Sequence, residues 1–380
     1  MKLGNKKPRK LRVAFLAGTL GQGGAEKQLY YMVRALREVG VTVYVYCLTS
    51  GEFYEKKLIE IGCSPIFLGK SSSPPRRLLT ILLQTIKDQP HILQSAHFFG
   101  NLYITLVGII RKALIIGAIR NDTIVELKEN KFWGHALLKS PTFMISNSSA
   151  AKQNAVGIRN KPIAVLPNVI DLVEFTQSIS QSQNRTADKV VVVTIARLEK
   201  FKNVEDFLIA LAISREKNQQ ITGIVVGDGP ERKRLEAISR ELNLTSEGVR
   251  FLGKRDDIPT ILSHADIFAL TSRHEGFPNV ILEAMAASLP VVTTPAGDAK
   301  SVIKDKITGF IIPYHSPEDM AARILELAGS QEMRKEMGIK GRQRVDNQYN
   351  FNQLREKLFT IYREFALLRD NQDLLGLING

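Results

Sequence analysis

The sequence predicts an α/β protein made of two doubly wound domains, each built around a parallel sheet. The chain has 380 residues, more than one hydrophobic core usually serves. Short apolar runs alternate with amphipathic helical segments, which is typical of parallel β-α-β units. A polar segment at 176–188 interrupts this alternation and indicates a linker. We therefore expect domains at 1–178 and 179–350, followed by a helical segment at 351–380 that packs back on the first domain.

The elements of the first domain follow from apolar periodicity. We expect strands at 13–18, 41–48, 91–95, 114–120 and 142–146, and helices at 25–39, 74–88 and 101–111. In the second domain the expected strands are 190–195, 223–226, 249–252, 267–270 and one starting at 291, with helices starting at 204, 231 and 279. Ligands of such sheets bind at the carboxyl ends of the strands.

The composition is that of a soluble protein, with 44% hydrophobic and 24% charged residues. Cys47 and Cys63 are too few for a disulfide framework or a metal-ligand cluster, so a reducing cytoplasm is expected. No segment reaches the about 20 apolar residues of a membrane span, and the start of the chain lacks a signal-peptide core. We expect a cytoplasmic protein, soluble or peripheral on the inner face of the cell membrane.

The positive charge is concentrated in the first half. Residues 1–180 hold 24 Lys and Arg against 11 Asp and Glu, and the remainder holds 28 against 27, from totals of 52 and 38. Such a surface favours an anionic partner, although a solvated basic surface is the alternative. The apolar and basic segment 75–87, with Arg111 and Lys112, predicts docking on an anionic membrane, or else an ordinary packed helix with a basic edge. No nucleic-acid-binding motif is present.

Glycines and cations follow several predicted strands. Gly23 and Gly24 open the first helix, and Gly227 lies in a turn after a strand; glycines there let backbone approach a phosphate, or simply form turns. Arg197 and Lys202 follow the strand at 190–195 and suit a diphosphate, unless they belong to an exposed basic loop.

The most informative segment is 274–283. Glu275 lies in a loop after a strand, Pro278 and Asn279 suit a helix start, and Glu283 lies about one turn into that helix. Carboxylates accept hydrogen bonds from sugar hydroxyls, while free helix N–H groups bind anions. A capped helix with a core-facing glutamate is the alternative.

Glu275 and Glu283 resemble the E-x7-E motif of the GT4 family of glycosyltransferases, within a similar frame from Ser272 to Val292. Gly23-Gly-Ala-Glu26, the segment 165–171 (with Val169 where glycine is usual), Arg197, Lys202, 227–230 and 249–253 resemble further family signatures, in family order. The resemblance covers about 13–345. It implies a GT-B fold, in which two Rossmann-like domains flank a cleft, and retaining, metal-independent sugar transfer with no cofactor.

The resemblance also implies roles for individual residues. Arg197 and Lys202 would hold the diphosphate, Glu275 the sugar hydroxyls and Glu283 the ribose. The remaining donor contacts would come from Gly23, Gly24, Gly227, Leu252, Gly253, Gly276, Phe277, Pro278, Asn279 and Val280. The first domain would bind the acceptor.

One position departs from the family pattern. Many relatives carry a histidine in the loop after the strand at 114–119, where this chain has Arg120 and Asn121. These two residues are candidates for the acceptor side. His97, at another strand end, is a candidate catalytic residue or a structural histidine.

No Asp-x-Asp occurs in the sequence, so we expect cations and a helix dipole, not a metal, to neutralise the leaving group. The predicted activity is transfer from a nucleotide diphosphate sugar, by resemblance UDP-linked, to a glycan or lipid-linked acceptor in cell-surface polysaccharide or glycoconjugate synthesis. The alternatives are a GDP-mannose-dependent transferase, a nucleotide-sugar-binding protein without transfer activity, and a nucleotide-sugar epimerase; nucleic acid is not an expected partner.

Overall fold

The computed structural model describes residues 10–69, 73–179, 189–244 and 247–379. The chain divides into an N-terminal unit, residues 1–168 with 352–380, and a C-terminal unit, residues 169–351. The boundary thus lies at Asn168 and not at the predicted position 178. Helix α8 (Val173–Ile179), which covers part of the predicted linker, packs against α11 (Ile258–Ser263) of the C-terminal unit. The rest of the predicted linker, 180–188, lies outside the described residues.

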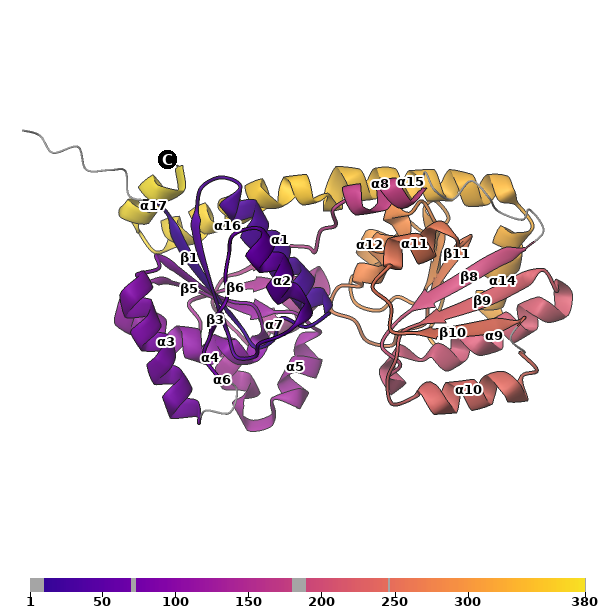
Figure 1. The fold of residues 1–380 in the computed structure, drawn as a ribbon, viewed down its shortest axis with the longest axis horizontal. Coiled ribbons are helices and arrows are strands. Elements are labelled where there is room, and N and C mark those ends of the chain that lie inside the picture. The colour runs from indigo at the N-terminus through magenta and orange to yellow at the C-terminus, as the bar shows by residue number, and fades with distance from the viewer. Residues whose placement is uncertain (1–9, 70–72, 180–188, 245–246, 380) are drawn as a thin grey trace, which may run out of the picture. The chain divides into compact units, whose positions relative to one another are not determined.

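The N-terminal unit contains a parallel sheet, some of whose strands are labelled in Figure 1. The strand order is β3-β2-β1-β4-β5-β6-β7. Its strands are β1 (Arg12–Ala17), β2 (Thr42–Cys47), β3 (Ile66–Phe67), β4 (Ile92–Ser95), β5 (Leu114–Ile119), β6 (Phe143–Ser146) and β7 (Ile163–Val165). The central strands β4, β5 and β6 are buried along their whole length, since helices cover both faces of the sheet.

Helices cover the two faces of this sheet. Its helices are α1 (Gly24–Arg37), α2 (Phe53–Glu60), α3 (Pro74–Asp88), α4 (Asn101–Arg111), α5 (Thr123–Glu129), α6 (Gly134–Lys139), α7 (Ser149–Val156), α16 (Leu354–Leu368) and α17 (Gln372–Asn379). The helices α3 and α4 pack against one face of the sheet, where their buried side chains form one apolar cluster with residues of β1, β4 and β5. On the other face α16 packs beside α1, and the ring of Phe365 stacks on Phe143 with 4.4 Å between centroids. The C-terminal segment therefore completes the N-terminal unit.

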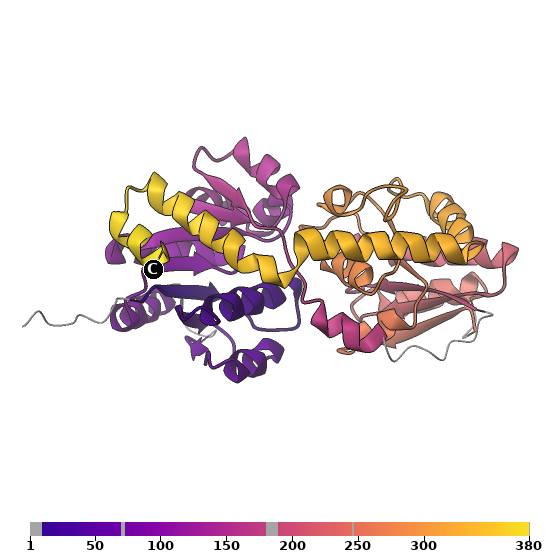
Figure 2. The same ribbon diagram turned by 90° about the horizontal axis from the view of Figure 1, so that it is seen from above.

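The C-terminal unit has a six-stranded parallel sheet in the order β10-β9-β8-β11-β12-β13. Its strands are β8 (Val190–Ile195), β9 (Ile221–Val226), β10 (Val249–Gly253), β11 (Ile267–Leu270), β12 (Val291–Thr293) and β13 (Gly309–Ile311). The other helices are α9 (Val204–Lys217), α10 (Arg232–Glu241), α12 (Asn279–Ala286), α13 (Ala299–Val302), α14 (Pro317–Ala328) and α15 (Gln331–Tyr349), the last running along this unit (Figure 2). Two apolar clusters pack on opposite faces of the sheet.

Both sheets share one feature that positions the site. The chain runs outward from β1 through β2 to β3 and then returns to place β4 on the other side of β1. The second sheet repeats this path, with β8, β9 and β10 in one direction and β11 on the other side of β8. In open parallel sheets, ligands bind at such reversals, outside the carboxyl ends of the strands. No helix in the described parts of the chain is both long and apolar enough to span a bilayer.

Candidate functional site

In the C-terminal unit, the reversal between β8 and β11 brings together two loops that carry predicted site residues. The loop after β8 contains a short 3-10 helix, Lys200–Lys202. The Thr271 hydroxyl donates to the carbonyl of Lys202 at 3.1 Å, and the backbone N–H of Arg273 donates to the carbonyl of Phe201 at 2.9 Å. These bonds fix the β11 loop against the β8 loop.

The result is an ion pair between Lys202 and Glu275. The ammonium Nζ lies 2.6 Å from Glu275 Oε1, and the two side chains are only 16% and 11% exposed. An ammonium has three donors and a carboxylate two acceptor oxygens, so each partner keeps hydrogen-bonding capacity for a ligand. The pair joins a residue predicted to bind phosphate to one predicted to bind sugar.

Arg197 lies in the same loop but makes a different contact. Its guanidinium is 2.9 Å from the carboxylate of Glu199 and its side chain is 74% exposed. The structure therefore brings Lys202, but not Arg197, into contact with Glu275. An exposed guanidinium can leave a surface carboxylate for a phosphate at little cost, because exposed ion pairs are worth at most about 1 kcal/mol.

Glycines let the loop after β9 pack directly on the Arg197 loop. Gly227 has φ +128°, and a Cβ built there would lie 1.8 Å from the carbonyl oxygen of Ala196. A Cβ on Gly229 would lie 2.5 Å from the carbonyl oxygen of Leu198. The N–H of Gly227 donates to the carbonyl of Gly253 at 2.8 Å, beside the half-buried Leu252. Gly227 thus has a demonstrable role in supporting the backbone around Arg197.

The segment after Glu275 leads into the start of α12. Gly276, Phe277 and Pro278 are buried, whereas Asn279, Val280 and Glu283 are half-buried. The first N–H groups of a helix have no carbonyl partner within it, so this helix start can hydrogen-bond an anion.

Sequence reasoning missed three residues that hold these loops in place. Gly297, with φ +56°, lies so close that a Cβ would be 2.6 Å from the carbonyl oxygen of Glu275. The Thr294 hydroxyl donates to the carbonyl of Ser272 at 2.6 Å, and Arg273 Nη2 donates to Asn203 Oδ1 at 3.1 Å. The only sequence signal for Gly297 was its position after a strand. Thr294 and Arg273 gave no signal, because their partners Ser272 and Asn203 lie far from them in the sequence.

In the N-terminal unit, His97 follows β4 at the reversal between β1 and β4. Its Nδ1 accepts a hydrogen bond from the backbone N–H of Gly18 at 3.2 Å, which leaves the proton on Nε2. That nitrogen lies 3.2 Å from Glu26 Oε1, and both side chains are largely buried. The ring also stacks on Phe99. Glu26, which sequence reasoning did not single out as a site residue, fixes the tautomer and orientation of His97.

The predicted glycine loop is built around the same glutamate. A Cβ on Gly23 would lie 2.3 Å from Glu26 Oε2, so a glycine leaves room for the carboxylate to fold back over the start of α1. Gly24 is the first residue of that helix and is exposed. The positive end of α1 therefore already has a carboxylate from its own first turn.

Arg120 and Asn121 follow β5 at the same edge of the sheet. Asn147 Nδ2 donates to the carbonyl of Arg120 at 2.9 Å, and the Asn121 carbonyl Oδ1 accepts from the N–H of Asp122 at 2.9 Å. Both residues are half-buried.

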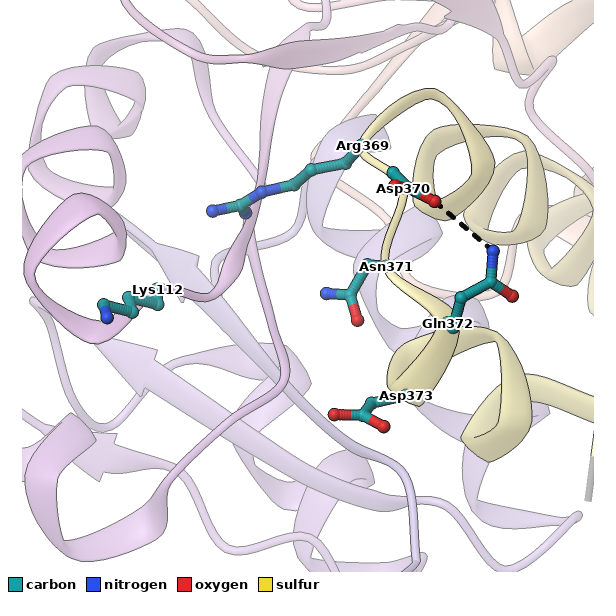
Figure 3. Close-up of a pocket in the computed structure, with 6 residues that line it drawn as sticks. All are labelled: Lys112, Arg369, Asp370, Asn371, Gln372 and Asp373. Carbon is teal, nitrogen blue, oxygen red and sulfur yellow. Dashed lines mark hydrogen bonds between the residues drawn. The ribbon is translucent and has the colours of Figure 1, made fainter.

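An open pocket of about 340 Å³ lies elsewhere in this unit, lined by Lys112 and by residues 369–373 (Figure 3). Within it Gln372 Nε2 donates to Asp370 Oδ1 at 3.4 Å. Because Lys112 lies two residues before β5, this pocket is at the amino ends of the strands, away from His97 and Arg120. Among the described residues, no three His, Cys, Asp or Glu side chains form a group that could hold a metal ion.

Each half of the chain matches the profile of a known glycosyltransferase family. The profile described as glycosyl transferases group 1 matches residues 175–344, and the profile described as glycosyltransferase family 4 matches residues 22–174. Together they span nearly all of both Rossmann-like domains.

Individual relatives are more distant. N-acetyl-alpha-D-glucosaminyl L-malate synthase of Bacillus anthracis is 29% identical over 219 residues, which is 56% of this chain and 56% of that protein. The alignment thus spans little more than half the length of that relative. The capsular polysaccharide biosynthesis glycosyltransferase CapM of Staphylococcus aureus is 22% identical over 307 residues, 76% of this chain and 81% of CapM.

Solved structures share the fold. Anabaena Alr3699/HepE, in complex with UDP and glucose, superposes with a TM-score of 0.81 at 20% identity, over 92% of this chain and 98% of that one. The likeness confirms the two Rossmann-like, parallel-sheet domains predicted from the sequence.

Proposed function

Because the chain belongs to the group 1 glycosyltransferases of family 4 and has the GT-B fold, we propose that it is a retaining, metal-independent enzyme that uses a UDP-sugar. Its acceptor is a glycan or a lipid-linked glycan, as in capsular polysaccharide synthesis, in which the relative CapM acts. The observation that carries the proposal is the Lys202–Glu275 pair at the reversal between β8 and β11.

The C-terminal unit binds the donor in this proposal. Lys202 and Arg197 bind the diphosphate and stabilise its charge as it leaves, which is the main electrostatic demand of the reaction. Glu275 binds sugar hydroxyls through its remaining oxygen, and Glu283 binds the ribose. Backbone groups from Gly276 to Val280 bind sugar and phosphate, and Leu252 with Gly253 contacts the base. The sequence lacks Asp-x-Asp, so the two cations replace a bridging metal.

UDP is the proposed nucleotide because Anabaena HepE was solved with UDP and with UDP-glucose, and pneumococcal GtfA with UDP and GlcNAc. His97, held by Gly18 and Glu26, is the catalytic candidate of the N-terminal unit, which binds the acceptor. Retention follows if the acceptor hydroxyl attacks the face of the sugar from which UDP departs.

A thermal-shift panel with UDP, GDP, ADP and CMP, without added metal, tests the donor site. UDP should raise the melting temperature selectively, because a ligand that binds only the folded state stabilises it. Glu283→Ala should abolish this rise, while Glu326→Ala, at an exposed position in α14, should preserve it. Selective stabilisation by GDP would favour the GDP-mannose alternative, and none by any nucleotide would refute the donor site.

Kinetics test transfer itself. Arg197→Ala should reduce kcat far more than it weakens UDP-sugar binding, since the guanidinium acts on charge that develops as the bond breaks. Unchanged turnover would contradict its role. UDP binding without turnover on any glycan acceptor would instead support a binding protein without transfer activity.

We also propose that the N-terminal unit docks on an anionic membrane surface. In α3 the exposed side chains of Leu79, Leu83 and Ile86 follow helical spacing, with exposed Arg76 and Lys87 alongside. The adjacent helix α4 exposes Leu106, Ile109 and Ile110. Apolar side chains bordered by cations suit the interface of a bilayer that contains anionic lipid.

Vesicle flotation tests this docking. The protein should float with phosphatidylglycerol vesicles at low salt and not with phosphatidylcholine vesicles, and Leu83→Glu should abolish flotation. Trp133 is the only tryptophan and is 58% exposed beside Phe132, 87% exposed. A blue shift of its fluorescence on flotation would place this pair at the lipid. No flotation with anionic vesicles at low salt would refute the docking.

A further inference from the structure

The carboxyl ends of β5 and β6 hold polar atoms for which the described chain supplies no partner. Arg120 follows β5 and Asn147 follows β6, two strands that pair along the sheet. Arg120 Nε and Nη2 and Asn147 Oδ1 are buried, and none of these three atoms has a hydrogen-bond partner among the described residues. Buried polar atoms are nearly always paired, so their coincidence at adjacent strand ends points to a missing group.

The backbone that carries these side chains is, by contrast, firmly held. Asn147 Nδ2 donates to the carbonyl of Arg120 at 2.9 Å, and its own N–H donates to the carbonyl of Ile119 at 3.1 Å. The backbone N–H groups of Arg120 and Asn121 also lie close enough to the Glu126 carboxyl to lower its pKa. The unpaired atoms therefore belong to a fixed loop. No ion pair joins the Arg120 guanidinium to a carboxylate in the part of the chain that the structure describes.

The charge of Arg120 is only partly compensated, because burial lowers the pKa of Arg120 by more than the nearby Glu126 carboxylate raises it. The neighbouring Tyr362 is fully buried and its hydroxyl donates to Gln94 Oε1 at 2.6 Å, so that hydroxyl proton is already used. Burial lowers the pKa of Arg120 to about 10, which still leaves it cationic at neutral pH. A buried cation without a hydrogen-bonded anion is destabilising, and an anion bound there would recover part of this cost.

The unpaired atoms define the chemistry of the missing group. The Nε and Nη2 atoms form one edge of the guanidinium fork, which matches two oxygens of a phosphate or carboxylate. Asn147 Oδ1 is an acceptor and requires a donor such as a hydroxyl. Arg120 as a whole is half-buried, and the site lies at the same sheet edge as His97, which follows the neighbouring strand β4.

We propose that Arg120 and Asn147 bind an anionic group of the acceptor, a phosphate or carboxylate with an adjacent hydroxyl. This inference rests on the proposed function, in which the N-terminal unit binds the acceptor. The basic excess of residues 1–180 attracts such a substrate to this unit. The anion belongs either to a soluble phosphorylated sugar or to the phosphate of a lipid-linked acceptor.

The first test is thermal melting with inorganic phosphate in the presence of saturating UDP, so that the diphosphate site is occupied. Phosphate should raise the melting temperature of the wild type, but not of Arg120→Met. Arg111→Met is the matched control, because Arg111 also has a buried, unpartnered Nε but lies at the opposite sheet edge. Its response to phosphate should equal that of the wild type. Equal responses of wild type and Arg120→Met would overturn the proposal.

Ligand-free stability gives a second readout. Arg120→Met should melt at or above the wild-type temperature, because it removes an unpaired buried charge. A large fall would show that Arg120 stabilises the fold and would overturn the proposal. If UDP still stabilises both the wild type and Arg120→Met, the donor site is intact. Failure of the anion-site proposal can then be distinguished from failure of the proposed function.

Acceptor kinetics and a comparison of soluble with lipid phosphates provide two further tests. Arg120→Met should raise the KM for the acceptor at least tenfold and leave UDP binding unchanged, with Arg120→Lys in between; an unchanged acceptor KM would overturn the assignment. Stabilisation by glucose 1-phosphate that depends on Arg120 would indicate a soluble acceptor. Flotation with phosphatidic acid vesicles that depends on Arg120 would indicate a lipid phosphate, and the absence of both dependences would refute the site.

Discussion

Glu126 provides the sharpest physical prediction that the structure allows. This residue of α5 is only 8% exposed, and burial raises the pKa of its carboxyl from the ordinary 4.5 to about 7. The backbone N–H groups of Arg120 and Asn121 oppose this shift but do not cancel it. At pH 8 the folded protein must therefore hold a buried, ionised carboxylate.

The sign and size of the effect follow from proton linkage. An acid with a raised pKa binds its proton more tightly in the folded state, so its stabilising contribution is complete below pH 4.5 and is lost as pH rises through 7. At roughly 1.4 kcal/mol for each tenfold change in proton affinity, Glu126 should reduce the free energy of unfolding by about 2–3 kcal/mol between pH 5 and pH 8.

Glu126→Gln removes this dependence and nearly preserves the shape. The difference in unfolding free energy between the variant and the wild type should grow by about 2–3 kcal/mol from pH 5 to pH 8. Any effect of the amide on the free energy of unfolding that does not depend on pH cancels in this comparison. Urea unfolding at fixed ionic strength, followed by Trp133 fluorescence, measures it, since Trp133 lies shortly after α5. Glu60→Gln, at an exposed position of α2 in the same unit, is the control and should show little change, because Glu60 does not act on the pKa of Glu126. Parallel pH profiles for wild type and Glu126→Gln would refute the reasoning.

Three further predictions concern the backbone at Gly227, the ion pair of Lys202 and the buried hydroxyl of Tyr362. Gly227→Ala should lower the free energy of unfolding by about 3 kcal/mol and weaken UDP binding, since its Cβ would meet the carbonyl of Ala196; urea unfolding and UDP titration check this. Lys202→Met should reduce kcat by about 10²-fold or more, through loss of leaving-group stabilisation, as steady-state kinetics would show. Tyr362→Phe should cost about 1–2 kcal/mol, because Gln94 Oε1 loses its donor, and thermal melting of this variant would detect the loss.

Much of the fold could be predicted from the sequence, because long apolar periodicities are strong signals. The helices α3 and α4 begin and end where they were expected. The strands β3, β7 and β13 were missed, since segments of two or three residues carry no usable period. The end of α8, residues 176–179, was assigned to a polar linker. Phe175, just before this segment and almost fully buried, shows why a helix forms there: it packs into the core of the C-terminal unit.

The site was predictable only where its residues are close in sequence. Glu275 and Glu283 lie on one loop and one helix, so their spacing alone suggested a ligand. The partners that position them were not visible, because Lys202 and Glu275 are 73 residues apart and Glu26 and His97 are 71 apart. Gly297 was overlooked for a different reason: its need for a positive φ depends on a loop that approaches it only in the folded chain.

Because both units have the same reversal of strand order, we expect one unit to bind the donor and the other to bind the acceptor. Each unit has its own reversal of strand order, and each reversal carries its own set of polar loops: Lys202 and Glu275 in one, Gly18 and His97 in the other. Among the described residues, the hydrogen bonds given above for each loop come from its own unit. Substitutions at His97, Glu26 or Arg120 should therefore alter the acceptor KM or kcat while leaving UDP titrations at their wild-type midpoint. If His97→Ala weakened UDP binding as strongly as Glu283→Ala, the donor site would depend on both units and this division of roles would be wrong.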